Sequence, residues 1–294
     1  MAKSGLTISL IFEAESANYT EGFGNITVLK KLSRGDGNAY SYISRQALRY
    51  NIINQLGWDD AESVYKDGKG EKAVVQFAPN ATIDKYPEID LFGYMKTKGK
   101  TDDAKGGATL RPAVVRLSNA ISMEPFKADL DYLTNMGLAK RKNYENSIAQ
   151  SEIHKSFYVY SIAIDLDRIG VDAGIELDNS ERARRVKAFL KTVSMPYRDI
   201  KGRRENLSPV FAIGGIYDRK NPFFENRLSL DNKKLDLAKI LSVLSSFEEL
   251  KENTLVGYID NTFANNGDIK EVLNPSTMGN FFQKLSEKVD EYYG

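Results

Sequence analysis

The stretch KKLSRGDGNAYSYISRQALRYNII, residues 30–53, combines a predicted fold element with an unusual concentration of positive charge. Its pattern predicts a strand, a glycine-containing loop and then a helix from Tyr40 to Leu56. Arg45 and Arg49 lie four residues apart, so they project from one face of that helix. Five cations in this stretch face a single carboxylate, Asp36. A loop rich in N–H groups that leads into a basic helix start favours anion binding, although a glycine turn beside a solvated arginine face is the simpler interpretation of this stretch alone.

Composition limits where a charged ligand can bind. The chain has 294 residues, 41% of them hydrophobic and 28% charged, which suits about two domains or one elaborated domain with a real core. Its formal net charge is only +1, so any nucleic-acid surface must be a local patch that acidic residues balance elsewhere. Residues 182–204 hold nine cations and one carboxylate, whereas residues 236–294 hold five lysines and ten carboxylates.

Several kinds of site are excluded by residue counts. The chain has no cysteine and a single histidine, His154, so disulfides, thiolate metal sites, cysteine nucleophiles and multi-histidine metal sites are excluded. His154 lies beside Lys155 in a polar region, which predicts a surface residue. No signal peptide and no apolar run of membrane-spanning length is evident, which predicts a cytoplasmic protein without a membrane partner.

The order of predicted elements indicates an α+β fold. The core order is strand, helix, strand, strand, helix, strand, which is the split βαβ or ferredoxin-like arrangement. The first helix follows the strand at residues 5–14, and the second starts at Asn179 or Ser180 and ends before Pro196. The remaining strands fall at residues 110–126, 157–165 and 209–217.

Finer patterns lead to further expectations for these elements. Within residues 110–126, period two predicts that Val114, Arg116 and Ser118 share one side. Gly214 and Gly215 in the last core strand indicate close backbone approach. Downstream, the pattern predicts helices at 235–250 and 278–292, with a short strand at 254–259 between them.

Aromatic residues on the 157–165 strand do not by themselves indicate RNA binding. Tyr158 and Tyr160 alternate there, but without the RNP consensus they are assigned to the core or to the cover of the sheet.

Basic residues gather at three predicted element boundaries, residues 30–49, 140–142 and 198–204. Each cluster alone is usually a solvated surface run. Three together in a near-neutral chain favour an RNA path, because arginine and lysine reach phosphates and arginine also stacks on bases. Asp36 is the one carboxylate suited to metal-assisted phosphodiester cleavage, although an aspartate that simply favours a turn is the simpler interpretation.

Four segments in order resemble the CRISPR-associated backbone subunit of Cascade, in the DevR-like branch of type I-B systems. They are ISRQALRYNI at Ile43–Ile52, LFGYM at Leu91–Met95, AVVRLSNAISMEPF at Ala113–Phe126 and GRRENLSPVFAIGGIY at Gly202–Tyr217. Together they cover most of residues 4–217.

The resemblance implies an RRM-like palm that carries two large insertions, called fingers and thumb. The palm would comprise residues 1–56, 111–126 and 156–235, with a C-terminal helical part at 236–294. The fingers would be residues 57–110 and the thumb residues 127–155.

The resemblance also implies the binding partners: CRISPR RNA, target DNA through that guide, other Cascade subunits, and copies of the chain itself stacked head to tail. The residues that would contact the guide, from the family motifs and the basic clusters together, are Arg34, Ser44, Arg45, Gln46, Arg49, Arg116, Ser118, Asn119, Lys140, Arg141, Lys142, Arg198, Lys201, Arg203 and Arg204.

The sequence therefore predicts a non-catalytic RNA-binding scaffold without cofactor or metal, in which base pairing reads the target. Two alternatives stay open. One is a ferredoxin-like endoribonuclease that uses Asp36 with a metal ion or acts through a general acid–base pair. The other is a small-molecule enzyme of the same fold, for which no convergent polar constellation is evident.

Overall fold

The main antiparallel sheet has the strand order that the split βαβ unit requires. The computed structural model describes residues 4–15, 18–20, 22, 26–67, 73–98 and 107–294. The central strand β1 (Gly5–Ala14) pairs with β13 (Ser156–Asp165) on one side and with β18 (Pro209–Tyr217) on the other. Beyond β13 lie β9 (Val115–Leu117) and β10 (Ala120–Ser122), so the order is last, first, third, second. The predicted α+β class is confirmed.

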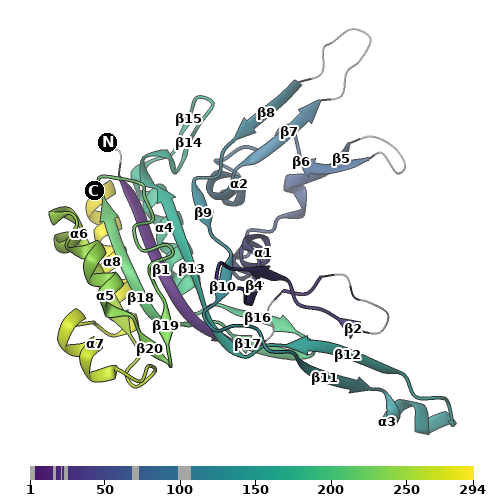
Figure 1. Cartoon of the computed structure of the whole chain (residues 1–294). Coiled ribbons are helices and arrows are strands. Elements are labelled where there is room, and N and C mark those ends of the chain that lie inside the picture. Colours follow the sequence, from purple (N-terminus) through teal and green to yellow (C-terminus); the bar gives the residue numbers. More distant parts are fainter. Residues whose placement is uncertain (1–3, 16–17, 21, 23–25, 68–72, 99–106) are drawn as a thin grey trace.

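Helices cover both faces of this sheet, and β1 is buried on both sides. Leu6, Ile8 and Leu10 pack against α1 (Arg45–Leu56), α4 (Asn179–Ser194) and α8 (Met278–Tyr293). Ile11 faces the opposite way, into a second cluster under α5 (Leu237–Leu244) and α7 (Asn266–Leu273). Figure 1 shows α5, α7 and α8 on the side of the molecule away from three projecting hairpins, whereas α1 lies close to the base of the hairpins.

Tyrosines and glycines in the central strands serve packing. Tyr158 and Tyr160 are buried, which confirms that they belong to the core. A Cβ on Gly214 would lie 2.1 Å from the Thr7 carbonyl oxygen, and one on Gly215 would lie 2.1 Å from the Asn253 carbonyl oxygen. The predicted close backbone approach at both glycines is therefore confirmed.

The first helix is shorter than predicted. Residues Ala39–Ile43 form strand β4, which pairs with β10 and with β3 (Lys31–Ser33), and α1 begins only after Ser44. Pairing on both sides stabilises the extended form of this aromatic segment and overrides its helical pattern. The helical pattern also predicts an apolar row through Ile43, Ala47 and Tyr50, and this row is wrong at Tyr50, because that side chain is 68% exposed.

Other predicted boundaries also need correction. Asp178, not Asn179 or Ser180, caps α4, and its carboxylate accepts from the main-chain N–H of Glu181. The helix predicted at residues 235–250 is two helices, α5 and α6 (Glu248–Asn253), because the chain turns after Leu244. The alternation expected from residue 114 does not begin there, because Val114 lies in a bend before β9. The predicted short strand near 254–259 is β21 (Leu255–Tyr258), on the edge of the sheet.

Three hairpins project from the sheet (Figure 1). Two lie near each other: β5 (Val64–Asp67) with β6 (Val74–Phe77), and β7 (Tyr94–Lys98) with β8 (Gly107–Arg111). The third, here called the long hairpin, is β11 (Asp129–Thr134) with β12 (Ile148–Ile153) and carries α3 (Met136–Ala139) at its end. Part of the segment expected to form the fingers, residues 57–110, lies outside the described residues.

Among the described residues no helix is long and apolar enough to cross a membrane. Smaller elements complete the chain. These elements are β2 (Ile26–Thr27), η1 (Ala61–Ser63), α2 (Pro87–Phe92), η3 (Lys140–Lys142), η4 (Leu166–Arg168), β14 (Val171–Asp172), β15 (Ile175–Glu176), β16 (Tyr197–Ile200), β17 (Arg203–Asn206), β19 (Leu230–Asp231) and β20 (Lys234–Leu235).

A buried ionic cluster fixes α2 against the rest of the fold. The Asp90 carboxylate is fully buried and lies 2.7 Å from Arg111 Nη2 and 2.9 Å from Arg185 Nη1. It also accepts from the main-chain N–H of Gly170, at 2.9 Å. Because these partners come from β8, from α4 and from the residue before β14, the cluster holds α2 in one orientation, and α2 lines the groove described below.

His154 is buried rather than exposed, so the predicted surface position is wrong. Its Nδ1 lies 2.7 Å from the Ser41 hydroxyl oxygen, which is also 2.7 Å from the Tyr158 hydroxyl. Its main-chain N–H donates to the Glu15 carbonyl. The residue sits where the long hairpin rejoins the sheet, and the burial lowers its pKa.

Candidate nucleic-acid interface

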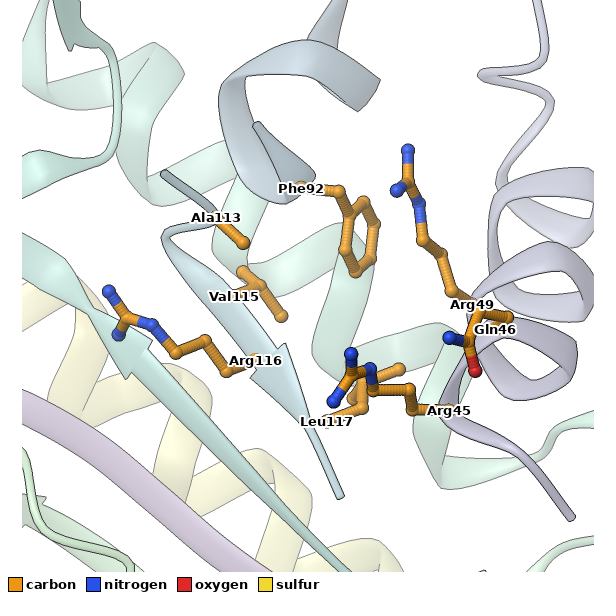
Figure 2. Close-up of a pocket in the computed structure, with 8 residues that line it drawn as sticks. All are labelled: Arg45, Gln46, Arg49, Phe92, Ala113, Val115, Arg116 and Leu117. Atoms are coloured by element: carbon orange, nitrogen blue, oxygen red, sulfur yellow. The ribbon is translucent and has the colours of Figure 1, made fainter. Parts of the chain in front are cut away.

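An arginine-lined groove lies between helix α1, strand β9 and the end of α2. Its volume is about 450 Å³. Figure 2 shows Arg45, Gln46 and Arg49 on the helix side, Arg116 on the strand side, and the Phe92 ring between them. These four polar residues were all predicted to bind RNA, and the structure brings them to one place.

Local hydrogen bonds fix the start of α1 at the groove. Ser44 caps the helix: its hydroxyl oxygen accepts from the main-chain N–H of Ala47, and its own O–H donates to Asn18 Oδ1. The main-chain N–H of Arg45 donates to Asn119 Oδ1 at 2.9 Å. The structure thus gives Ser44, which is buried, and Asn119 a positioning role beside Arg45.

Arg49 is held by one carboxylate and one ring. Its Nη2 lies 2.8 Å from Glu88 Oε1, and its guanidinium carbon lies 5.0 Å from the centre of the Phe92 ring. Both partners belong to α2. The side chain keeps 34% of its surface exposed, so the guanidinium still faces solvent.

Arg116 is held more firmly. Its two terminal nitrogens lie 2.8 and 2.9 Å from the two oxygens of the buried Asp165 carboxylate. These hydrogen bonds raise the pKa of Arg116. Within the described part of the chain, no ion pair involves the exposed Arg45. The three arginines therefore range from unpaired to doubly bonded.

Arg49 also lies at the junction of the groove with two neighbouring hollows. One, of about 500 Å³, runs toward the two neighbouring hairpins and includes Val75 and Met95. The other, of about 290 Å³, includes Glu88 and Asp59. The cationic surface is therefore continuous with an exposed apolar surface on the hairpins.

A second basic surface is the turn between β16 and β17. Lys201 has φ of +49° and Gly202 has φ of +76°, which makes a tight turn that exposes Lys201, Arg203 and Arg204. Arg204 pairs with Asp199 at 2.9 Å across the hairpin. Gln55 Nε2 donates to the Tyr197 carbonyl at 2.7 Å, which connects this turn to α1.

Arg198 does not belong to this exposed surface. It is 5% exposed and lies 2.6 Å from Glu205 Oε2, its cross-strand partner in the hairpin. The expectation that Arg198 reaches RNA must be corrected, because the alternation of the strand turns its side chain inward.

The remaining predicted residues lie apart from the groove. Lys140, Arg141 and Lys142 are exposed at the end of the long hairpin. Arg34 is exposed and lies 4.4 Å from the Tyr40 ring. Ser118 accepts from the main-chain N–H of Ser161, so it is used within the sheet.

Asp36 is an exposed turn residue in the structure. One carboxylate oxygen accepts from the main-chain N–H of Asn38, at 3.0 Å, and the other accepts from the Tyr40 hydroxyl. The hydrogen bond from Tyr40, followed by that from Asn38, lowers the pKa of Asp36. Across the described ranges, no three acidic, histidine or cysteine side chains gather into a possible metal site.

The sequence did not reveal three residues that shape the groove: Phe92, Glu88 and Asp165. Phe92 was inside the LFGYM motif, but nothing indicated that its ring would lie beside Arg49. The two carboxylates are 39 and 49 positions from their arginines, so no local spacing connects them.

An α+β protein with an arginine-lined groove of this kind belongs to the class of proteins that can bind an extended polyanion. The family model described as "CRISPR-associated negative auto-regulator DevR/Csa2" matches residues 6–232. The chain therefore belongs to the CRISPR-associated DevR/Csa2 family, and the resemblance inferred from its four motifs is confirmed.

Individual relatives agree with this assignment. The "CRISPR-associated protein Cas7/Cst2/DevR" of Myxococcus xanthus (strain DK1622) is 28% identical over 171 residues, or 54% of this chain. The chain matches 56% of that relative's length. A chain of a "CRISPR RNA-guided surveillance complex, pre-nicking" has a TM-score of 0.57 at 14% identity and covers 97% of this chain and 100% of that one. A second chain, of a "CRISPR RNA-guided surveillance complex", has a TM-score of 0.56 at 15% identity and covers 97% of this chain and 99% of that one. At such identities the likeness shows the fold alone.

Proposed function

We propose that this protein is the guide-RNA-binding backbone subunit of a Cascade effector complex, of the type I-B branch, and that it acts in the cytoplasm. The observation that carries the proposal is the groove, which gathers four of the residues predicted from sequence to contact RNA. Membership in a CRISPR-associated family and a fold shared with chains of RNA-guided complexes support it.

The groove would hold phosphates rather than read bases. Arginine guanidinium groups bind phosphate oxygens without regard to sequence, so one surface can hold any guide. Arg45 and Arg49 are one helical turn apart on α1, which suits successive phosphates of a single strand, whereas the guanidinium of Arg116 points away from them and is bonded to Asp165. Target DNA would then be recognised by base pairing with the guide.

Self-assembly along the guide would cover the long hairpin, which serves as the thumb. Its residues Tyr132, Leu138 and Tyr144 are 60, 61 and 69% exposed. Apolar groups on an extended hairpin favour contact with another molecule, and we propose a neighbouring copy stacked head to tail. The other two hairpins would be the fingers and the main sheet with its helices the palm, with other Cascade subunits at the ends of the stack.

The proposed role is non-catalytic. Asp36, the one acid suspected from sequence, is engaged by Asn38 and Tyr40 in its own turn. Incubation of bound RNA with Mg²⁺ or Mn²⁺ should leave the RNA intact. Cleavage at regular spacing by the wild type, lost in Asp36→Ala, would contradict this role and favour the endoribonuclease.

Light scattering with and without long single-stranded RNA tests the proposal as a whole. RNA should convert the protein into particles whose mass grows with RNA length, since a head-to-tail interface does not close. Double-stranded DNA of equal length is the control and should have a much smaller effect. A monomer mass that RNA leaves unchanged would contradict the proposal.

A further inference from the structure

The ion pair between Arg49 and Glu88 differs from the other pair in the groove. Among the described residues the Glu88 carboxylate pairs with one cation, Arg49, at 2.8 Å from Oε1 to Nη2, and its side chain is 16% exposed. The Asp165 carboxylate instead makes two bonds to Arg116, is 5% exposed, and also faces Arg168 and Lys220 at 3.8 and 3.9 Å.

These contacts determine which pair can exchange its carboxylate for a phosphate. Removing Arg116 from Asp165 would leave a buried carboxylate short of partners, which is costly. Glu88 is partly solvated and can turn toward water, while Arg49 remains beside the Phe92 ring. Arg49 is therefore the paired groove arginine that can accept a new anion.

We infer that Glu88 is an internal phosphate substitute that sets the affinity of the groove for RNA. In the free protein its carboxylate occupies the position on Arg49 that an RNA phosphate would take. Binding then exchanges one anion for another at Arg49, while Arg45, which has no ion pair among the described residues, accepts a phosphate without exchange. This inference rests on the proposed function and adds a residue that determines its strength.

Two consequences follow from the exchange. A phosphate contact at Arg49 adds less affinity for RNA than a contact at an unpaired arginine would add, because the ion pair with Glu88 is lost on binding. It also releases fewer counterions, because Glu88 already neutralises Arg49 in the free protein. Both effects should disappear when Glu88 loses its charge.

The test compares Glu88→Gln with wild type in the binding of a short labelled single-stranded RNA, over a range of salt concentrations. Glu88→Gln should bind about two- to fivefold more tightly, the range of a partly exposed ion pair. The slope of log affinity against log salt should become steeper by up to about 0.7, the value of one phosphate contact on a single strand.

Asp59→Asn is the matched control. Asp59 is exposed and lines the same hollow as Glu88 and Arg49, so the variant removes the same charge without releasing Arg49. The second control is Glu88→Gln in an Arg49→Gln background, where its gain should fall to that of Asp59→Asn. If Glu88→Gln folds poorly, Glu88→Asp replaces it in the test, because it keeps the charge of the first turn of α2. Glu88→Asp should give an affinity between those of the wild type and Glu88→Gln.

The outcomes separate this inference from the proposed function. If the wild type binds RNA and Glu88→Gln binds no more tightly than Asp59→Asn, Glu88 is not a phosphate substitute, although the groove still binds RNA. If Glu88→Gln still increases the affinity for RNA in the Arg49→Gln background, Glu88 is likewise not a phosphate substitute on Arg49. If the wild type does not bind RNA, the proposed function fails and this inference fails with it.

Discussion

At the scale of single residues, the groove is an arrangement of arginines restrained to different degrees. Arg45 has no ion pair among the described residues, Arg49 makes one charged contact and Arg116 makes two. The arginines themselves could be predicted, because spacing by four places Arg45 and Arg49 on one helix face. The restraint of Arg49 and Arg116 could not be predicted, because Glu88 and Asp165 come close to these arginines only through tertiary packing.

Replacing Arg45 and Arg49 with alanine should weaken RNA binding at least tenfold, because a charged hydrogen bond contributes about 1.5 kcal/mol or more. The salt slope should become shallower by about 0.7 for each lost phosphate contact. Fluorescence anisotropy with unrelated RNA sequences measures both. Lys251→Ala with Lys284→Ala, two exposed cations on α6 and α8, is the control. An equal loss in both double variants would place these arginines outside the RNA path.

Burial decides how much an ion pair contributes to stability. Asp90→Ala would remove the carboxylate that the buried Arg111 and Arg185 share, leaving them Asp172 and Glu181 as partners, and should lower the free energy of unfolding by about 3 kcal/mol. Asp199→Ala breaks only an exposed pair with Arg204 and should change stability little. Urea unfolding compares the two. Similar stabilities would mean that the Asp90 cluster does not hold α2 in place.

At the scale of elements, the sequence predicted the order of the core correctly but not every boundary. The strands at residues 5–14 and 157–165 were predictable because they are long and apolar. Ala39–Ile43 was assigned to a helix because its pairing with β3 and β10 is not visible locally. The boundary signal was Ser44, a favoured cap residue, four positions after Tyr40. His154 was misplaced because only the tertiary fold buries the base of the long hairpin.

The base of the long hairpin should lose stability in mild acid. Burial places the pKa of His154 in the folded protein below its unfolded value of 6.5, so the unfolded chain binds the proton more readily. Stability should therefore be full above about pH 6.5 and fall as pH decreases from 6.5 toward the folded pKa. His154→Gln should flatten this part of the curve, because the chain has no other histidine. Thermal unfolding at pH 7.5 and 5.5 measures the change of stability with pH in the wild type and in His154→Gln. The same change in both proteins would contradict this role of His154.

At the scale of the whole molecule, hairpins reach out from a well-packed sheet. Figure 1 shows the long hairpin extending away from the helices that cover the sheet. Such a shape has little to pack against within one chain, and its apolar side chains remain exposed. From the sequence these segments could be expected only as insertions, which the family resemblance implies, because a sequence pattern does not give the direction in which a hairpin projects.

Leu138→Ser with Tyr144→Ser should reduce RNA-dependent assembly severalfold without changing the fold of the monomer, because both side chains are more than half exposed. Met195→Ser with Phe247→Ser is the matched control, since those residues are 67 and 63% exposed elsewhere on the molecule. Sedimentation with long RNA measures assembly. Loss of assembly in both variants alike would indicate a general effect of hydrophobicity rather than a thumb contact.

The most direct measurement is the nucleic acid that remains with the protein after purification and nuclease treatment. If the protein is a guide-binding backbone, the preparation should have an elevated ratio of absorbance at about 260 to 280 nm, as bound RNA requires. The RNA recovered should form a narrow length distribution, and Arg45→Ala with Arg49→Ala should lose most of it. Nucleic-acid-free protein from cells that express the matching CRISPR RNA would contradict the account.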